Sequence, residues 1–102
     1  MKDKKLIIKR YQGKLLGVEA TRECKDFFVE DFLNIKKLVR FISDLYDHET
    51  AFTKTGFKFL EEYYGIDEIV KILKKEEPDF PYDIKMTAKD YLYSCAEYAL
   101  DE

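Results

Sequence analysis

The sequence is short of the residues that most metal and nucleotide sites use. Its 102 residues include one histidine, two cysteines and four glycines, and there is no tryptophan. Zinc needs four protein ligands, or three and a water, and Cys24, His48 and Cys95 are too scattered to form a local pair with finger or ribbon spacing. Gly13 and Gly17 match neither standard phosphate-loop spacing, and the EF-hand pattern is missing. We therefore expect no metal and no cofactor.

The single histidine also limits catalysis. A nucleophile activated by a base would have to use His48, which stands between Asp47 and Glu49 beside a predicted helix end. A histidine there is most often solvated or interacts with the helix dipole. Adjacent carboxylates are numerous, as on the solvated face of a short helix, and none is singled out as an acid or base. We expect no enzyme; the alternative is a site built from Asp, Glu and Tyr alone, or completed by another subunit.

Long apolar runs are absent as well. The basic start of the chain is followed only by Leu6, Ile7 and Ile8, too short a run for a secretory signal peptide. No stretch approaches the roughly 18 apolar residues of a membrane span. A secreted domain of this size often carries four or more cysteines. We expect a cytoplasmic protein, no membrane contact and two reduced thiols, with a Cys24–Cys95 bridge as the alternative.

What the chain does have is apolar and charged residues in quantity. Hydrophobic residues make up 46%, aromatic residues 16% and charged residues 38% of the sequence. A disordered chain has few aromatic residues, so this composition predicts one folded domain over residues 1–102. The net charge of −3 is unevenly divided, with +5 over residues 1–42 and −8 over residues 43–102. Such an asymmetry is a hint about partners.

The first part of the chain favours β-structure. The apolar runs Lys5–Tyr11 and Leu15–Ala20 flank Gln12 and Gly13, and two such runs around a short glycine-containing link predict an antiparallel hairpin. Residues 22–33 are ambiguous. Phe27, Phe28 and Val29 favour a third strand, whereas helical spacing is also present, and both interpretations stay open. The helical spacing is carried by Cys24, Phe28, Phe32 and Ile35.

The rest of the chain predicts short helices. Apolar residues recur with helical spacing over residues 35–46, with Asn34 as the N-cap. After a connection over residues 48–55, a helix over 56–64 ends at Gly65. A third helix, capped by Asp67, buries Ile69, Val70 and Leu73 and stops before Pro78; a loop over 79–86 follows.

The last predicted helix is capped by Thr87 and has Ala88, Tyr91, Leu92, Cys95 and Ala99 on its inner face, with Tyr93 and Tyr98 outside it. Strands followed by helices indicate an α+β fold. We expect an N-terminal antiparallel hairpin or three-stranded meander, followed by three to four short helices packed on it.

Acidic and aromatic residues alternate between Glu61 and Asp83. Such a face can dock a partner with a basic surface, because complementary charge speeds association and tyrosine often anchors an interface. The plainer interpretation is that the aromatic residues belong to the core and the acids only keep the protein in solution. The residues predicted to bind a partner are Glu61, Glu62, Tyr63, Asp67, Glu68, Glu76, Glu77, Asp79 and Tyr82.

Together these features favour a protein-binding module that acts by occluding its partner. In size and composition alone, the chain is similar to inhibitor, immunity and anti-defence (anti-CRISPR) proteins of phages and mobile elements, and one version is an acidic mimic of nucleic acid. A homo-oligomer that uses Tyr93 and Tyr98 is a further hypothesis. The alternative function is nucleic-acid binding through a basic stripe in the N-terminal half. That stripe would contain Lys2, Lys4, Lys5, Lys9, Arg10, Lys14, Lys36, Lys37 and Arg40.

Overall fold

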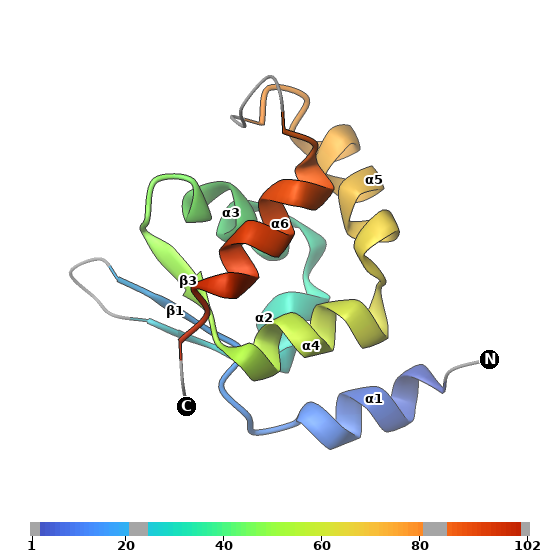
Figure 1. Cartoon of the computed structure of the whole chain (residues 1–102). Helices are drawn as coiled ribbons and strands as arrows, with labels where there is room; N and C mark the ends of the chain where they lie inside the picture. The colour runs from blue at the N-terminus through green and yellow to red at the C-terminus, as the bar shows by residue number, and fades with distance from the viewer. Residues whose placement is uncertain (1–2, 21–24, 81–85, 101–102) are drawn as a thin grey trace.

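The protein has the α+β class that the sequence predicts. A computed structural model describes residues 3–20, 25–80 and 86–100, and these ranges contain one three-stranded antiparallel sheet and six helices. Figure 1 shows the sheet at one side of the molecule, with α6 across the centre and α1 beside α4 at the lower edge. The elements are α1 (Lys4–Tyr11), β1 (Gly17–Glu19), β2 (Asp26–Phe27), α2 (Val29–Leu33), α3 (Ile35–Leu45), β3 (Thr50–Phe52), α4 (Lys54–Tyr63), α5 (Ile66–Glu76) and α6 (Ala88–Glu97).

The predicted N-terminal hairpin is wrong, because its first strand is the helix α1. The Asp3 side chain caps this helix by accepting hydrogen bonds from the backbone of Lys5 at 3.0 Å and of Leu6 at 3.4 Å. Ile7 and Tyr11, one helical turn apart, are buried where α1 packs on α4. An N-cap and one apolar pair therefore outweigh the strand preference of the apolar run. Gly13 does take a positive φ of 78°, but in the turn that follows a helix.

The sheet has the order β2-β1-β3, with β1 antiparallel to both neighbours. Its third strand, β3, lies in the segment predicted to be a mere connection, so that prediction is wrong. The ambiguous segment contains both alternatives: β2 ends at Phe27, and α2 starts at Val29. The strand thus stops earlier than predicted, because the Phe28 backbone N–H donates to the Asp31 carboxylate at 3.0 Å and so begins a helix.

The later helices largely confirm the sequence prediction. Asn34 caps α3 and accepts from the Lys37 backbone at 3.2 Å, and Thr87 caps α6 and accepts from Asp90 at 3.1 Å. Gly65 has a φ of 84° and donates its N–H to the Leu60 carbonyl at 2.9 Å, which ends α4. Two details differ. α4 begins at Lys54 rather than at residue 56, and the N-cap position of α5 is Gly65 rather than Asp67.

Four segments meet at Thr53, which is 1% exposed. Its backbone N–H donates to the Leu16 carbonyl at 3.1 Å, and its hydroxyl donates to the Leu15 carbonyl at 2.7 Å. The same hydroxyl oxygen accepts from the Gly56 N–H at 2.9 Å and so caps α4. Leu100 forms a parallel bridge with Thr53 from beyond the end of α6. The junction therefore joins the entry to β1, the end of β3, the start of α4 and the C-terminal segment.

The core is built around phenylalanine. Phe32, Phe41, Phe52 and Phe59 are fully buried, and the ring of Phe41 lies 5.0 Å from that of Phe32 and 5.3 Å from that of Phe52. The half-buried Tyr64 and the buried Tyr91, at the edge of this core, keep hydrogen-bond partners. The Tyr64 hydroxyl donates to the Phe32 carbonyl at 2.8 Å, and the Tyr91 hydroxyl donates to the Ile42 carbonyl at 3.4 Å.

The first prediction concerns Gly56, where a Cβ would lie 1.7 Å from the Leu16 carbonyl oxygen. Because the new Cβ would meet the Leu16 backbone rather than a flexible side chain, Gly56→Ala should force α4 away from the Leu16 segment. We expect it to lower the free energy of unfolding by about 3 kcal/mol or more. Gly13→Ala is the control, since Gly13 has open space around it and only its positive φ is affected, at about 1 kcal/mol. Urea unfolding measures both. Equal losses for the two variants would contradict the close approach.

The second prediction concerns pH. Burial raises the pKa of Tyr64 to about 12, from an ordinary value of 10.0. The folded protein therefore keeps a proton that the unfolded chain loses between those values, so this stabilisation is complete below pH 10 and is lost as the pH rises towards 12. Tyr64→Phe should lower the free energy of unfolding by about 1 kcal/mol at pH 7.

Urea unfolding at several pH values should show the gap between the wild type and Tyr64→Phe closing above pH 10. Tyr98→Phe serves as the control, because the Tyr98 side chain is exposed. A gap that stays constant up to pH 12 would show that the Tyr64 hydroxyl does not titrate abnormally.

Candidate functional site

The structure divides the predicted acidic face into two groups. Glu61, Glu62 and Tyr63 end α4, and Asp67 and Glu68 lie in the first turn of α5, so these five residues flank the Gly65 turn. We call them the α4–α5 corner. The other group, Glu76, Glu77 and Asp79, lies at the far end of α5, about 15 Å along the helix. Tyr82 lies outside the described residues. Exposed lysines separate the two groups: Lys71, Lys74 and Lys75.

Some of these carboxylates also have a local structural role. Asp67 and Glu68 lie in the first turn of α5, where a negative charge interacts favourably with the helix dipole. Lys74 and Lys75 complete the same pattern in the last turn. Asp67 also pairs with Lys89 of α6 at 3.3 Å, between two side chains that are mostly solvated. Some of the predicted partner-binding acids therefore also stabilise α5.

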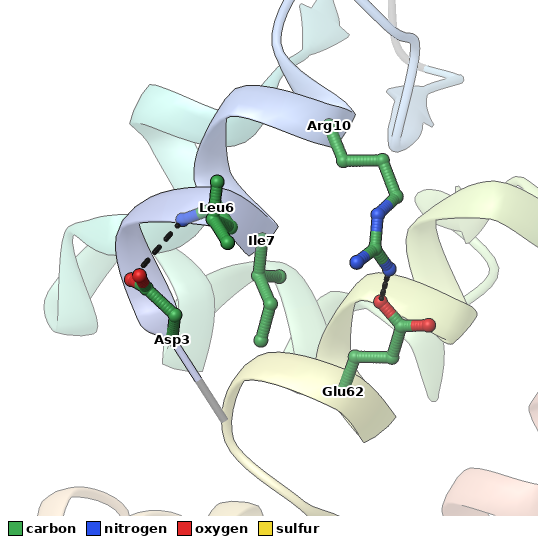
Figure 2. Close-up of a pocket in the computed structure, with 5 residues that line it drawn as sticks. All are labelled: Asp3, Leu6, Ile7, Arg10 and Glu62. Atoms are coloured by element: carbon green, nitrogen blue, oxygen red, sulfur yellow. Dashed lines mark hydrogen bonds and ion pairs between the residues drawn. The ribbon is translucent and has the colours of Figure 1, made fainter. Parts of the chain in front are cut away.

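Helix α1 brings positive charge to the same corner. The Arg10 guanidinium lies 2.8 Å from the Glu62 carboxylate, and the Lys4 ammonium lies 4.9 Å from the centre of the Tyr63 ring. Figure 2 shows the Arg10–Glu62 pair closing one side of a pocket between α1 and α4. The pocket has a volume of about 310 Å³, and Asp3, Leu6 and Ile7 complete its lining. The two charged halves of the sequence therefore meet in space.

Tyr63 is the aromatic residue at the centre of the corner. Its half-buried ring stacks on Phe59 at 5.3 Å and meets the edge of Tyr64 at 4.8 Å. Phe59 in turn contacts Tyr11 of α1 at 5.4 Å. Burial, and then the nearby Glu62 carboxylate, raise the pKa of Tyr11, so its hydroxyl stays neutral at physiological pH. Tyr63 is held rigidly on the core, as an anchor residue of an interface needs to be.

Other aromatic residues of the acidic segment turn inward. Tyr64 donates to a backbone carbonyl in the core, and Phe80 is buried with its ring 5.4 Å from Tyr91. For these two residues the plainer interpretation of the sequence, that they are core, is the right one. Tyr63 is half-buried, and the acids Glu61, Asp67 and Glu68 at the Gly65 turn are exposed.

The predicted basic stripe is split between two places. Lys4, Lys5 and Lys9 are exposed on α1, whereas Lys36 and Arg40 are exposed on α3. Figure 1 places α1 at the lower edge of the molecule and α3 at the opposite upper side. Lys37 of α3 also pairs with Asp31 at 3.4 Å. The structure does not bring the basic residues into one continuous line.

Two residues of the pocket, Asp3 and Leu6, were missed by the sequence reasoning. Leu6 is 59% exposed, whereas the sequence pattern predicts it to lie in the first strand of a hairpin. The signal that could have found it was an aspartate followed by apolar residues with helical spacing, because Asp3, Ile7 and Tyr11 together indicate a capped amphipathic helix.

The described part of the chain contains no cluster of metal-ligating side chains. Within residues 3–20, 25–80 and 86–100, no group of three His, Cys, Asp or Glu side chains could hold a metal ion. Cys95 has a free, half-buried thiol, and burial raises its pKa, so the reactive thiolate is scarce at neutral pH. Cys24 lies outside the described residues.

Comparisons of this chain with protein-family models, with curated proteins and with solved structures find no match. Of the helices in the described residues, none is both long enough and apolar enough to cross a lipid bilayer. Only the geometry and charge of the described surfaces therefore bear on function.

The third prediction is that the Arg10–Glu62 pair contributes little to stability. Because both side chains are more than a third solvated, Arg10→Gln and Glu62→Gln should each lower the free energy of unfolding by less than about 1 kcal/mol. Ile7→Ala on the same helix should cost about 2–4 kcal/mol, because Ile7 is buried. Urea unfolding of the three variants tests this. A loss above about 2 kcal/mol for either charged residue would show that the pair, rather than apolar packing, holds α1 in place.

Proposed function

We propose that the protein is a small binding module that occludes a basic surface of another protein, and that it docks through the α4–α5 corner. The observation that carries this proposal is the placement of Tyr63. Its ring stacks on Phe59, and the exposed carboxylates of Glu61 and Glu68 lie within five residues of it in sequence. A rigid aromatic side chain among negative charges suits a partner rich in lysine or arginine.

The neighbouring pocket supports the same proposal. It adds the exposed side chain of Leu6 and a hollow of about 310 Å³ to the corner. Glu62 already holds a guanidinium there, that of Arg10, in a solvent-exposed pair. An arginine of the partner takes the same position at little cost, since an exposed pair of this kind contributes less than about 1 kcal/mol.

Occlusion requires no chemistry of its own. A negative surface that covers a basic groove competes with whatever polyanion the groove normally binds, and long-range charge attraction raises the association rate. Small inhibitors, immunity proteins and anti-defence proteins of phages or mobile elements work in this way when they mimic nucleic acid. We place this protein in that functional class, with a site of action in the cytoplasm.

The fourth prediction tests the corner by charge reversal. The variant with Glu61, Glu62, Asp67 and Glu68 all replaced by Lys should keep its fold, because Glu61, Asp67 and Glu68 are exposed and Glu62 is only half-buried. It should lose at least about 100-fold in affinity for the partner, and the wild-type affinity should fall as the salt concentration rises. The partner is first identified by affinity capture and mass spectrometry, and the affinity is then measured by calorimetry.

A matched pair of double variants separates the corner from general electrostatics. Glu61→Lys with Glu68→Lys changes the net charge as much as Asp26→Lys with Glu30→Lys, and all four side chains are exposed. Only the first pair should weaken binding strongly. Equal effects of the two pairs, or unchanged affinity of the fourfold variant, would remove the proposed site.

Nucleic-acid binding is the second candidate function, and the exposed lysines of α1 favour it. Under this alternative, the capture experiment recovers nucleic acid, and gel-shift affinity falls steeply with salt. The split between α1 and α3 makes one continuous nucleic-acid track unfavourable. No gel shift at low salt would dismiss this alternative.

A further inference from the structure

A groove on the opposite side of the molecule has no part in the proposed α4–α5 interface. It lies between the end of α3, the strand β3 and the end of α6, and its volume is about 380 Å³. Figure 1 places these elements on the left, whereas α1 and the junction of α4 with α5 lie on the right. The groove is lined by Leu45, His48, Thr50, Ala51, Phe52, Cys95 and Tyr98.

We propose that this groove binds one apolar side chain of a basic segment in a partner protein. The inner wall is suited to an apolar group, because Leu45 and Phe52 are buried and Ala51 offers only a methyl group. Cys95 adds a sulfur atom of low polarity. These groups form no charged or strongly polar floor, so water in the groove gives way readily to a hydrocarbon or aromatic side chain.

Two tyrosines at the groove have exposed side chains that contribute little to the stability of the fold. Tyr98 lines the groove and is 81% exposed, and Tyr46, next in sequence to Leu45, is 48% exposed. Tyr98 stands at the C-cap of α6, where a backbone hydrogen bond from its N–H to the Cys95 carbonyl fixes its position. A tyrosine with a fixed main chain and a solvated ring packs against a ligand at a small entropic cost.

The charged residues that neighbour the groove lining in sequence share one sign. Four charged residues directly precede or follow a lining residue in sequence, and all four are acidic. Three of them, Asp47, Glu49 and Glu97, are exposed. A partner side chain entering the groove is therefore favoured when its neighbours are lysine or arginine, and an acidic segment is repelled. The fourth acidic neighbour is Asp44.

The backbone at the edge of the groove is unusual. Among the described residues, His48 is the one non-glycine residue with a positive φ, at 60°. Hydrogen bonds from the His48 N–H to the Leu45 carbonyl at 3.1 Å and from the Glu49 N–H to the Asp44 carbonyl at 3.0 Å hold this turn. The turn leads directly into β3, so it sets the direction of the imidazole that lines the groove.

The test is an NMR titration of the whole protein with short synthetic peptides. The probe peptide has a central phenylalanine with two lysines on each side; one control has alanine at the centre, and the other has glutamates in place of the lysines. The probe should shift the amide signals of Ala51, Cys95 and Tyr98 in a saturable way, with an affinity about tenfold or more above that of either control. No saturable shifts, or equal affinity for all three peptides, would overturn the proposal.

Two tyrosines of α6 form a matched pair of variants. Tyr98→Ala should weaken binding of the probe about tenfold, because Tyr98 lines the groove. Tyr93→Ala should change it less than about twofold, since Tyr93 is also exposed but its ring contacts Phe57, 5.7 Å away, outside the groove. Equal effects of the two variants would place the peptide elsewhere.

A second copy of the chain is the competing occupant. Sedimentation of the wild type and of Tyr98→Ala distinguishes it, because a dimer that Tyr98→Ala converts to monomer would show self-association and overturn the proposal. A wild-type monomer that binds the probe supports it. The test is independent of the α4–α5 corner, because none of the corner residues lines the groove.

Discussion

The fold depends on one buried threonine that connects segments from distant parts of the chain. Thr53 directly follows β3, caps α4 through its hydroxyl, and bonds to both Leu15 and Leu16 at the entry to β1. A hydroxyl that accepts one hydrogen bond and donates another satisfies two backbone groups at once. The close contact of Gly56 with Leu16 then fixes how α4 leaves the sheet. Helix α1 packs on α4, and α5 directly follows α4 in the chain. The Thr53 junction therefore determines where the α4–α5 corner lies.

The sequence was sufficient to predict the fold class and the helices that carry their own caps. Asn34, Gly65 and Thr87 mark helix boundaries by local hydrogen bonding or by backbone preference, which a sequence displays directly. The errors lie where tertiary packing decides. Residues Lys5–Tyr11 are apolar enough for a strand, and the Asp3 cap together with the burial of Ile7 and Tyr11 against α4 makes them a helix. Strand β3 has three residues, too few to leave a pattern, and it exists because β1 pairs with it.

The candidate site was predicted in part. The acids around Gly65 come together because they are close in sequence, and Tyr63 is half-buried beside them. The uneven charge of the two halves suggested two separate faces, yet Arg10 lies against Glu62. The local sequence does not indicate which distant helix will pack against a given acidic residue. The groove beside Tyr98 was equally hidden, since it combines α3, β3 and α6, and no short motif connects them.

The phenylalanine core has a consequence for motion. The rings of Phe27, Phe41 and Phe52 follow one another with centre-to-centre distances of 4.9 and 5.3 Å, and Phe57 continues the row at 5.8 Å from Phe52. In so dense a row, half-turns of one ring about its axis require its neighbours to move aside together. The rates of these ring flips therefore report how often the core expands collectively, and they can be measured without an added label.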